Sequence, residues 1–477
     1  MPDYDFDVAI LGAGTAGMSA YREAVKYTSR IALIDGGELG TTCARVGCMP
    51  SKLLIAAADA RHHADHASRF GIVSGGTKVD GKAVMVRLRA ERDRFVGFAL
   101  DAIEGFSTGE IIRAHGNFLD DHTLELANGR TLTARNIIIA TGSRPNIPSP
   151  FKAAGDRVIV NDDVFHWDDL PESVAVFGAG MIGLELCQAL HRLGVRVRLF
   201  GRNNLIGPLS DPAVRAYAAK TFAEEFSAHW QADAQVSRDG DAVVVTWSDE
   251  NGTGKEHFEN LLVATGRHAN VDGIGLENTS LKRDTRGVPI YDPHSLRAGD
   301  SHIFIAGDAT VELPLLHEAA DEGRLAGENA ARFPDSYRRA RRTAISVVFT
   351  DPQIAMAGES YGSLMDRGVA FETGAISFED QGRARVMGVN KGLLHVYGEA
   401  GSGRLLGAEM IGPQAEHLAH LLAWSIAGRM TVTEVLERPF YHPVIEEGLR
   451  SALRKLNGKL GFGANPPLRC IDCGPGA

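Results

Sequence analysis

Residues 7–17 read DVAILGAGTAG, and this stretch decides the fold. Its first five residues are mostly apolar, as expected for a central parallel strand that is buried on both faces. Gly12, Gly14 and Gly17 follow at the spacing G-x-G-x-x-G. These glycines permit a tight turn, close approach of the backbone to a pyrophosphate and close packing of a helix on the strand. The stretch therefore predicts a βαβ unit that binds a dinucleotide at the N-terminus of its helix.

A second strand, predicted at residues 31–34, ends in Asp35. An acid about 20 residues after the first glycine is what binding of ribose hydroxyls requires. A lone glycine triplet would be weak support, but strand, triplet, helix, strand and acid in this order make a strong pattern. The N-terminal part is therefore predicted to be a nucleotide-binding domain of the α/β class.

The pattern recurs in the middle of the chain. A β-rich run at residues 173–177 leads into three glycines with the same spacing, Gly178, Gly180 and Gly183. After a helix and a strand at residues 195–200, Gly201 stands where the acid would be, with Arg202 and Arg198 beside it. Guanidinium groups can pair with a 2′-phosphate, so this unit is predicted to favour NADP(H) over NAD(H). The alternative is that the arginines only solvate a loop.

Cys43 and Cys48 lie five residues apart in residues 40–52, which read GTTCARVGCMPSK. The chain has 477 residues and five cysteines, too few for a disulfide scaffold. A reducing cytoplasm is therefore the preferred location, and close-spaced cysteines there are more often catalytic or metal-binding than structural. The alternative is a static disulfide or two buried thiols.

The composition excludes several classes of protein. The formal net charge of −10 argues against nucleic acid as a partner. No run approaches the roughly 18 apolar residues that a membrane-spanning helix needs. Residues 1–7 are acidic and lead at once into a strand, which is not the pattern of a secretory signal. A soluble cytoplasmic protein is expected.

Together these motifs resemble those of the class I FAD-dependent pyridine nucleotide–disulfide oxidoreductases, a family that includes dihydrolipoyl dehydrogenase, glutathione reductase and mercuric reductase. The resemblance covers nearly the whole chain. It implies an α/β fold with two Rossmann-like domains, one for FAD and one for NAD(P), and a C-terminal α+β dimerisation domain. The implied boundaries are 1–143 and 268–340 for the FAD domain, 144–267 for the NAD(P) domain, 341–465 for the dimerisation domain and 466–477 for a flexible tail.

Three strand ends and one helix complete this resemblance. Residues 137–143 and 261–267 look like crossovers between the nucleotide domains. Asp308 resembles the acid that holds the ribityl hydroxyls of the flavin, and the helix from Leu316 resembles the one beneath the flavin ring. The implied cofactor-binding residues are Gly12, Gly14, Gly17, Asp35, Thr42, Lys52, Gly116, Thr141, Gly142, Asp308, Leu316, Gly178, Gly180, Gly183, Arg202 and Gly266.

The resemblance also implies that Cys43 and Cys48 form a redox-active disulfide, through which electrons pass between NAD(P)H and a disulfide substrate, and it assigns a role to each cysteine. Cys48 would lie beside the flavin as a thiolate, and Cys43 would exchange with the substrate disulfide. A helix starting near Pro50 is expected to lower the cysteine pKa through its N-terminal field. Lys52 and Glu185 resemble the ion pair beside flavin N5, where a cation stabilises the reduced flavin.

Thiol exchange needs a proton acceptor, and His442 with Glu447 resembles the family's acid–base pair. Pro443 suits the first turn of a helix, which would leave His442 at its mouth. Glu447 would orient the imidazole, with Glu446 as an alternative, giving a base and its orienter. In the family this pair reaches the active site of the other subunit, so a homodimer is implied. The alternative is an ordinary histidine at a helix N-terminus.

Residues 50–52, Pro-Ser-Lys, and the His442–Glu447 pair make dihydrolipoyl dehydrogenase the nearest relative. The implied substrate is a disulfide, either a small molecule or one carried by a protein such as a separate lipoyl carrier. Mercuric reductases lack this acid–base pair. The alternative is an NADPH-dependent reductase of another disulfide or of a metal ion that uses Cys470 and Cys473. This C-terminal pair could also be dispensable.

Two further features receive no functional assignment. His62 and His66 share a helix face at a spacing that could hold a metal, but a solvated face is the preferred interpretation. Cys187 lies within a predicted helix and is expected to pack in the interior. No metal site is therefore predicted.

Overall fold

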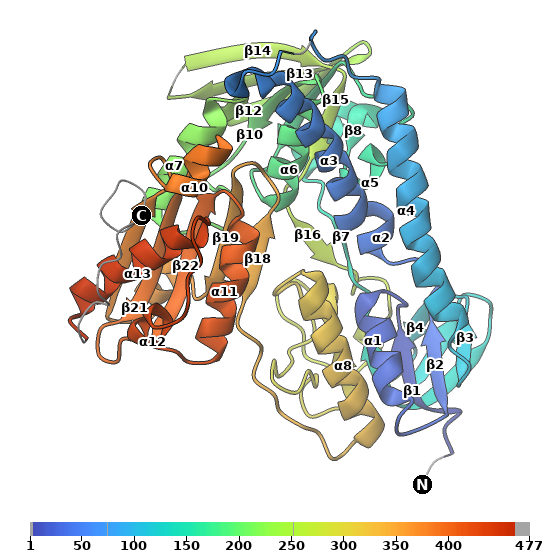
Figure 1. The fold of residues 1–477 in the computed structure, drawn as a ribbon. Helices are drawn as coiled ribbons and strands as arrows, with labels where there is room; N and C mark the ends of the chain where they lie inside the picture. The colour runs from blue at the N-terminus through green and yellow to red at the C-terminus, as the bar shows by residue number, and fades with distance from the viewer. Residues whose placement is uncertain (1–2, 74, 251, 463–477) are drawn as a thin grey trace. The chain divides into compact units, whose positions relative to one another are not determined.

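The computed structural model describes residues 3–73, 75–250 and 252–462. It is a mixed α/β structure whose residues fall into two units (Figure 1). Unit 1 comprises residues 1–53, 86–146 and 266–341, and unit 2 comprises the described residues of 54–85, 147–265 and 342–477. Residues 54–85, which the sequence analysis assigned to the first nucleotide domain, thus cluster with unit 2.

Unit 1 is built on a seven-stranded sheet with the order β3-β2-β1-β6-β5-β4 and with β17 paired to β6. Its strands are β1 (Phe6–Leu11), β2 (Ile31–Ile34), β3 (Glu110–Ile112), β4 (Gly116–Phe118), β5 (Thr123–Leu126), β6 (Thr131–Ile139) and β17 (Ile303–Ile305). The first three strands, β6 and β17 pair in parallel, whereas β4, β5 and the start of β6 are antiparallel. The parallel part is buried on both faces, which explains its apolar sequence.

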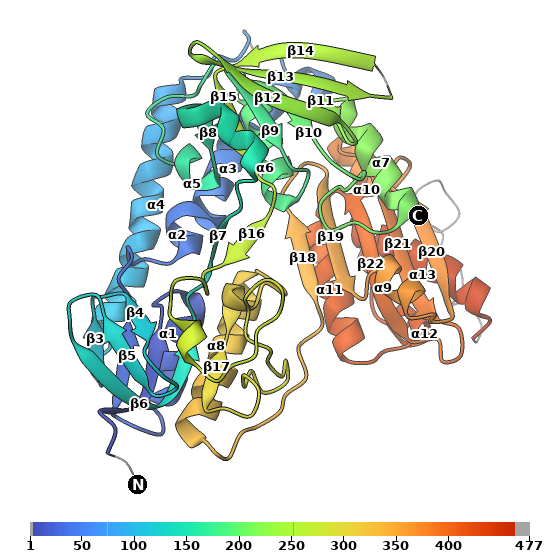
Figure 2. The same cartoon turned by 180° about the vertical axis from the view of Figure 1, so that it is seen from behind.

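Two helices of unit 1, α1 (Thr15–Ala24) and α8 (Leu316–Arg332), lie side by side (Figures 1 and 2). A Cβ atom on Gly323 or Gly327 would overlap the backbone of α1, so glycine at these positions lets the helices touch. Unit 1 also contains α2 (Thr42–Val46), the start of α3 (Cys48–Asp65), most of α4 (Gly81–Glu104), the antiparallel pair β7 (Ser143–Pro145) and β16 (Arg267–Ala269), η3 (Leu276–Asn278) and η4 (Gly307–Thr310).

Unit 2 contains a parallel five-stranded sheet with the order β11-β10-β9-β15-β8. The strands are β8 (Val158–Ile159), β9 (Ser173–Phe177), β10 (Arg196–Phe200), β11 (Ser227–His229) and β15 (Asn260–Val263). An antiparallel sheet of β12 (Asp233–Asp239), β13 (Ala242–Asp249) and β14 (Gly252–Phe258) packs against it through a core that includes Phe177, Phe200 and Val245. The accompanying helices are η1 (Ala67–Phe70), η2 (Ser149–Arg157), α5 (Asn161–Val164), α6 (Met181–Arg192) and α7 (Pro212–Ala223).

The C-terminal part of unit 2 is an antiparallel sheet with the order β18-β19-β22-β21-β20. Its strands are β18 (Ile345–Val348), β19 (Gln353–Gly358), β20 (Phe371–Ser377), β21 (Leu393–Glu399) and β22 (Leu405–Gly412). Its helices are α9 (Tyr361–Asp366), α10 (Gly382–Met387), α11 (Ala415–Ala427), α12 (Val432–Leu436) and α13 (Glu446–Leu460), and residues of α11, α12 and α13 share one core with the sheet. The predicted fold class, two dinucleotide-type sheets followed by an α+β part, is confirmed.

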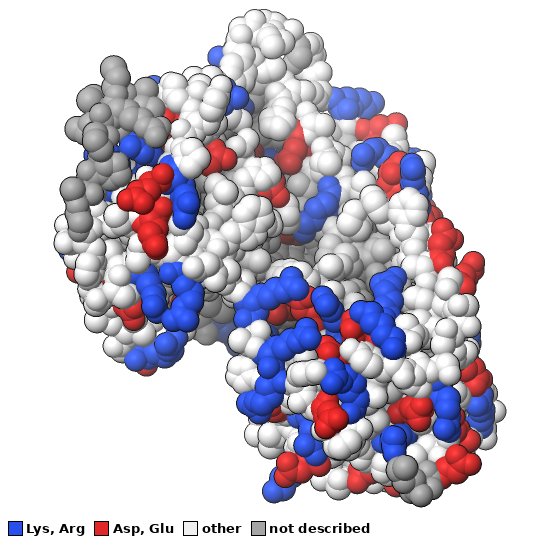
Figure 3. Space-filling model, turned by 60° about the horizontal axis from the view of Figure 1, so that its bottom comes forward, with Lys and Arg blue, Asp and Glu red and all other residues white. Residues whose placement is uncertain are grey.

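Acidic and basic side chains both occur across the face drawn in Figure 3. The arginine-rich segment after α8 illustrates the pairing of these charges, since Arg338 contacts Asp292 at 2.6 Å and Arg339 contacts Glu328 at 2.7 Å. Among the residues that the structure describes, no helix combines the length and the apolar character needed to cross a bilayer.

Candidate functional site

The first glycine loop joins β1 to α1, and its three glycines are required for different reasons. Gly12 has φ +106°, and a Cβ atom on it would overlap the carbonyl oxygen of Ala140. A Cβ atom on Gly17 would overlap the carbonyl of Gly12. Gly14, in contrast, has no protein atom within 4 Å of the place of a Cβ. The protein itself excludes side chains at two positions, and the third leaves open space at the N-terminus of α1, where a pyrophosphate would bind.

Polar groups surround this loop at the carboxyl ends of the parallel strands. Asp35 follows β2, and its carboxylate accepts hydrogen bonds from Ala13 N and Gly37 N, both at 2.7 Å. The hydroxyl oxygen of Thr141 is buried and has no hydrogen-bond partner among the described residues. A buried hydroxyl of this kind needs a partner, and a polar ligand can supply one.

Asp308 lies in η4, directly after β17, and accepts a hydrogen bond from the hydroxyl of Ser143 at 2.9 Å. Arg267 Nε donates to the same hydroxyl at 2.8 Å. Sequence reasoning missed Ser143 and Arg267, although both follow the strand-end motifs that it identified. With the open glycine loop, Asp35 and the buried Thr141 hydroxyl, these groups fit the FAD that the sequence predicts.

The other residues predicted to bind cofactor in unit 1 occupy several elements. Gly116 begins β4, Gly142 and Gly266 have positive φ angles with open space around them, Thr42 begins α2, and Leu316 begins α8.

Alanine substitutions should separate the roles of the glycines. We expect Gly17→Ala to destabilise the protein by about 2–4 kcal/mol, because its Cβ overlaps backbone atoms. We expect Gly14→Ala to fold normally but to bind FAD at least about tenfold more weakly, since its methyl group would occupy the space for phosphate. Thermal denaturation and titration of the apoprotein with FAD measure the two effects. Normal FAD affinity in Gly14→Ala would show that the loop does not hold this cofactor.

The second glycine loop, between β9 and α6, repeats the contacts of the first. Gly178 has φ +111°, and a Cβ atom on it would overlap the carbonyl of Ala264. Gly183 would overlap the carbonyl of Gly178, and Gly180 has open space. Unit 2 therefore carries a second dinucleotide-type loop with the same division of roles.

The two arginines near this loop have different surroundings. Arg202 is exposed in the turn after β10. Arg198 Nε donates to Glu256 at 2.7 Å, and its guanidinium lies 4.6 Å from the ring centre of Trp247. Alternate residues of β10 point toward the β12–β14 sheet, and this geometry gives Arg198 its partners. These contacts engage part of the Arg198 guanidinium but do not test its role, so pairing of Arg202 or Arg198 with a 2′-phosphate stays a prediction, and Arg202 is the more exposed of the two.

A glycine brings the two predicted redox cysteines together. Thr41 N-caps α2 by accepting from Ala44 N at 3.2 Å. Gly47 separates α2 from α3, and a Cβ atom there would lie 2.9 Å from the carbonyl of Thr42 and 3.2 Å from Cys43 Cα. Glycine thus allows α3 to start at Cys48, close to Cys43. The two cysteines are thiols and not a disulfide in this structure, with Cys43 half-buried and Cys48 exposed.

The interaction between the thiols changes the acidity of Cys43. A side-chain hydrogen bond with Cys48 raises the pKa of Cys43, burial raises it further, and the nearby Lys52 ammonium opposes both effects. The hydrogen bond and the burial oppose the lowering by the helix field that the sequence predicts, and this lowering stays a prediction. Cys43 consequently needs a base before it can act as a nucleophile.

His442 and Glu447 form the predicted pair within unit 2. The Nδ1 atom of His442 lies 3.0 and 3.1 Å from the two carboxylate oxygens of Glu447. The Glu447 side chain is 8% exposed and that of His442 is 55% exposed. The carboxylate can hold a proton on Nδ1, which leaves Nε2 at the surface as a proton acceptor. Glu447, rather than Glu446, orients the imidazole.

The local structure around His442 differs from the prediction in one respect. Helix α13 begins at Glu446, so Pro443 lies before the helix and His442 is not at its mouth. The backbone N–H of Val444 donates instead to Glu447 at 3.2 Å. The carboxylate of the first helical turn therefore reaches back to both the imidazole and the preceding backbone.

The remaining predicted residues have mixed outcomes. Lys52 lies in the part of α3 that belongs to unit 1, and Glu185 lies in unit 2, so their ion pair stays a prediction. Cys187 is fully buried, as predicted. His62 is half-buried and its ring stacks on that of His66 at 4.1 Å, so this pair is more than a solvated face. Cys470 and Cys473 lie outside the described residues.

Comparison with known proteins matches both parts of the chain. Residues 6–323 match the family described as pyridine nucleotide-disulphide oxidoreductase, and residues 344–453 match its dimerisation domain. A mercuric reductase from Streptomyces lividans is 32% identical over 457 residues, covering 92% of this chain and 93% of that protein. A dihydrolipoyl dehydrogenase from Chlamydia muridarum is 30% identical over 456 residues, covering 93% and 95%.

Solved structures show the same fold. LpdA from Mycobacterium tuberculosis has a TM-score of 0.81 at 25% identity, covering 94% of this chain and 99% of that chain. The flavoprotein disulfide reductase RclA from Escherichia coli has a TM-score of 0.79 at 20% identity, covering 93% and 98%. The chain therefore belongs to the pyridine nucleotide–disulfide oxidoreductase family, whose members use FAD and a pyridine nucleotide.

Proposed function

We propose that this protein is a homodimeric enzyme that moves electrons between NADP(H) and a disulfide through Cys43 and Cys48. The observation that carries the proposal is the His442–Glu447 pair, because an imidazole that is oriented by a carboxylate and is 55% exposed suits thiol–disulfide exchange. The activity proposed is like that of dihydrolipoyl dehydrogenase, one of the relatives that the chain matches. Bound FAD would accept electrons from the nicotinamide and pass them to the protein disulfide.

The protein's own residues would carry out the exchange. His442 takes the proton from the Cys43 thiol, whose raised pKa makes a base necessary. The Cys43 thiolate attacks the substrate disulfide, forms a mixed disulfide and releases one thiolate, which receives the proton from His442. Cys48 then attacks Cys43, releases the second substrate thiolate and closes the protein disulfide. Lys52 and Glu185 would form an ion pair near the flavin.

A homodimer is the arrangement in which His442 would serve Cys43 of the other subunit. The dimerisation-domain match supports the dimer. Leu421 and Trp424 of α11 leave 38% and 69% of their surface exposed within this domain, as expected for side chains that a second copy covers. The proposed substrate is a small disulfide or one borne by a protein, including a lipoyl carrier. The cytoplasm is the proposed location, because five cysteines in 477 residues are too few for a disulfide scaffold.

An anaerobic titration tests the proposal. We expect NADPH to reduce the flavin and to produce the long-wavelength absorbance of a thiolate beside oxidised flavin, and lipoamide disulfide to reoxidise the enzyme. Absence of the band with both NADPH and NADH would overturn the assignment of the cysteines. NAD⁺-dependent oxidation of dihydrolipoamide would instead identify NAD(H) as the nucleotide.

Arg202 is proposed to select NADP(H). We expect Arg202→Gln to lower kcat/KM for NADPH by about 10- to 100-fold, the effect of losing a charged hydrogen bond of about 1.5–3 kcal/mol. The value for NADH should change little. Arg196→Gln, which removes a charge from β10, the strand that precedes the turn with Arg202, is the control because Arg196 pairs with Glu256. Equal losses for both nucleotides would rule out a 2′-phosphate contact.

The second candidate is reduction of a metal ion, favoured by the mercuric reductase relatives. Mercuric ion added under NADPH would then drive metal-dependent nucleotide oxidation, and this activity would depend on Cys470 and Cys473. Reduction of lipoamide without any response to mercuric ion would exclude it.

A further inference from the structure

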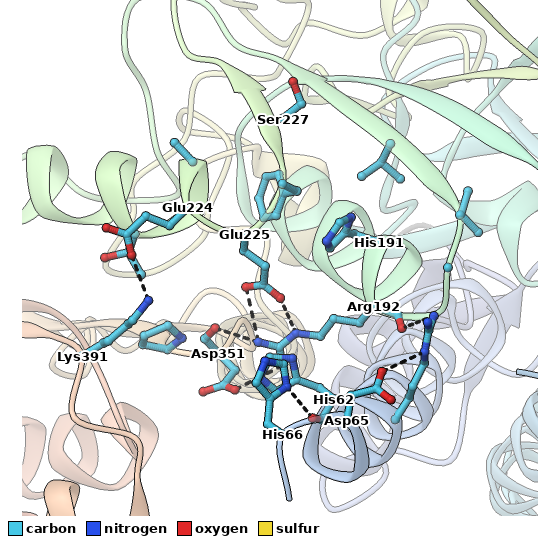
Figure 4. A pocket seen from close by; sticks show the side chains of 18 of the residues that line it. His62, Asp65, His66, His191, Arg192, Glu224, Glu225, Ser227, Asp351 and Lys391 are labelled. Atoms are coloured by element: carbon cyan, nitrogen blue, oxygen red, sulfur yellow. Dashed lines mark hydrogen bonds and ion pairs between the residues drawn. The ribbon is translucent and has the colours of Figure 1, made fainter. Parts of the chain in front are cut away.

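A buried guanidinium connects three segments of unit 2. The side chain of Arg192, at the end of α6, is 4% exposed. It pairs with Asp59 of α3 at 2.8 Å, with Glu225 after α7 at 2.6 Å and with Asp351 before β19 at 3.2 Å. Figure 4 shows Arg192 joined to Glu225 and Asp351. Because the three carboxylates meet at this one buried cation, Arg192 ties the three segments together.

The same face of α6 makes further polar contacts. Glu185, Gln188 and Arg192 have the spacing i, i+3 and i+7, which places them on one side of the helix. Gln188 donates to the carbonyl of Asp351 and accepts from its N–H, both at 2.8 Å. Glu185 accepts from Phe349 N at 2.9 Å. These contacts fix the rotation of α6 about its axis.

Helix α3 also carries the residues that concern the proposal on one of its faces. Cys48, Lys52 and Asp59 have the spacing i, i+4 and i+11, so they share one side of α3. Lys52 precedes Asp59 by seven residues, as Glu185 precedes Arg192.

We propose that Asp59 and Arg192 are positioning residues for the redox reaction. Their hydrogen bond sets the rotation of α3 about its axis, and so orients the Cys48 thiol and the Lys52 ammonium at the start of that helix. This inference rests on the function proposed above.

Arg192 is the cation that can perform this role at neutral pH. Its pairs with Glu225 and Asp351 lie at a pocket of about 1120 Å³ that is also lined by His62, His66 and His191 (Figure 4). Burial lowers the pKa of His62 to about 4, and the charge of Arg192 contributes, so the imidazole stays neutral. Other lining charges pair with each other, as in the 2.9 Å contact of Lys391 with Glu224.

Asp59→Asn tests the proposal with little change of shape. Burial raises the pKa of Asp59, although the charge of Arg192 opposes this effect, so burial penalises the charged carboxylate. The neutral amide does not carry this penalty, and Arg192 keeps its pairs with Glu225 and Asp351. We therefore expect normal FAD content and Tm. We expect the long-wavelength band of the two-electron-reduced enzyme to shift or weaken, and electron transfer to the disulfide to slow by about tenfold or more. Reduction of the flavin by NADPH should keep its rate.

Glu225→Gln is the matched control, because it removes another partner of Arg192 that does not lie on α3. It should lower Tm and leave the long-wavelength band unchanged.

A wild-type band and rate in Asp59→Asn would overturn the proposal, as would an equal change of band in Glu225→Gln. Absence of the band in the wild-type enzyme would instead overturn the proposed function. If Asp59→Asn does not fold, Arg192→Lys keeps the charge and loses the planar fork, and an unchanged band there would overturn the proposal.

Discussion

Cys43→Ser will abolish turnover with disulfide substrates while NADPH still reduces the bound flavin. We expect a loss of at least about 10³-fold in kcat, because a serine hydroxyl cannot replace the thiol that exchanges with substrate. Steady-state assays with lipoamide disulfide measure turnover, and anaerobic stopped-flow absorbance measures flavin reduction.

The matched control for this variant is Cys187→Ala. Cys187 is fully buried in α6, so its loss should affect stability and leave the redox steps unchanged. If Cys43→Ser kept a tenth or more of the wild-type activity, electrons would reach the disulfide by another route, and the role proposed for Cys43 would be wrong.

His442→Gln should give the second largest loss, of about 10²- to 10⁴-fold in disulfide turnover, the usual contribution of a general acid–base group. The Cys43 thiol holds its proton because its pKa is raised, so the loss should become smaller as the pH rises and hydroxide takes over deprotonation. A pH profile of kcat measures this. Glu447→Gln should lose less, since the imidazole remains but is no longer oriented by a carboxylate.

Mixing the two inactive variants tests whether the site is shared between subunits. In a symmetric dimer with shared sites, a heterodimer of Cys43→Ser and His442→Gln contains one intact site. Random exchange of subunits should then restore about a quarter of the wild-type activity. No recovery after proven exchange would place His442 and Cys43 of one chain in the same site.

The glycine loops could be predicted from sequence because their causes are local. Gly12 and Gly17 are required by the turn from strand to helix, and the same spacing in Gly178 and Gly183 gives the same contacts. The imidazole–carboxylate pair was also accessible, since only five residues separate His442 from Glu447. The start of α13 was not, because proline is compatible with a first helical turn but does not require one.

Contacts between segments that are distant in the chain were harder to predict from the sequence. The hydrogen bond between the Cys43 and Cys48 thiols raises the pKa of Cys43. The two thiols lie close together because Gly47 folds the chain back on itself, which the position of the helix alone does not reveal. Arg198 faces a sheet formed some 50 residues later, so its partner Glu256 could not be read from β10. The sequence does show that Glu185, Gln188 and Arg192 are polar residues on one side of α6, but not which residues they contact.

The three-part assembly of unit 1 constrains the biosynthesis of the enzyme. The carbonyl of Ala140 closes on Gly12, and Asp308 completes the same strand edge, although both are far along the chain from the first loop. A nascent chain on the ribosome cannot complete this pocket until β17 and α8 have been translated, by which time the whole second nucleotide sheet has already emerged. Loading of the flavin is thus a late event, and truncated translation products cannot compete with the finished enzyme for the cofactor.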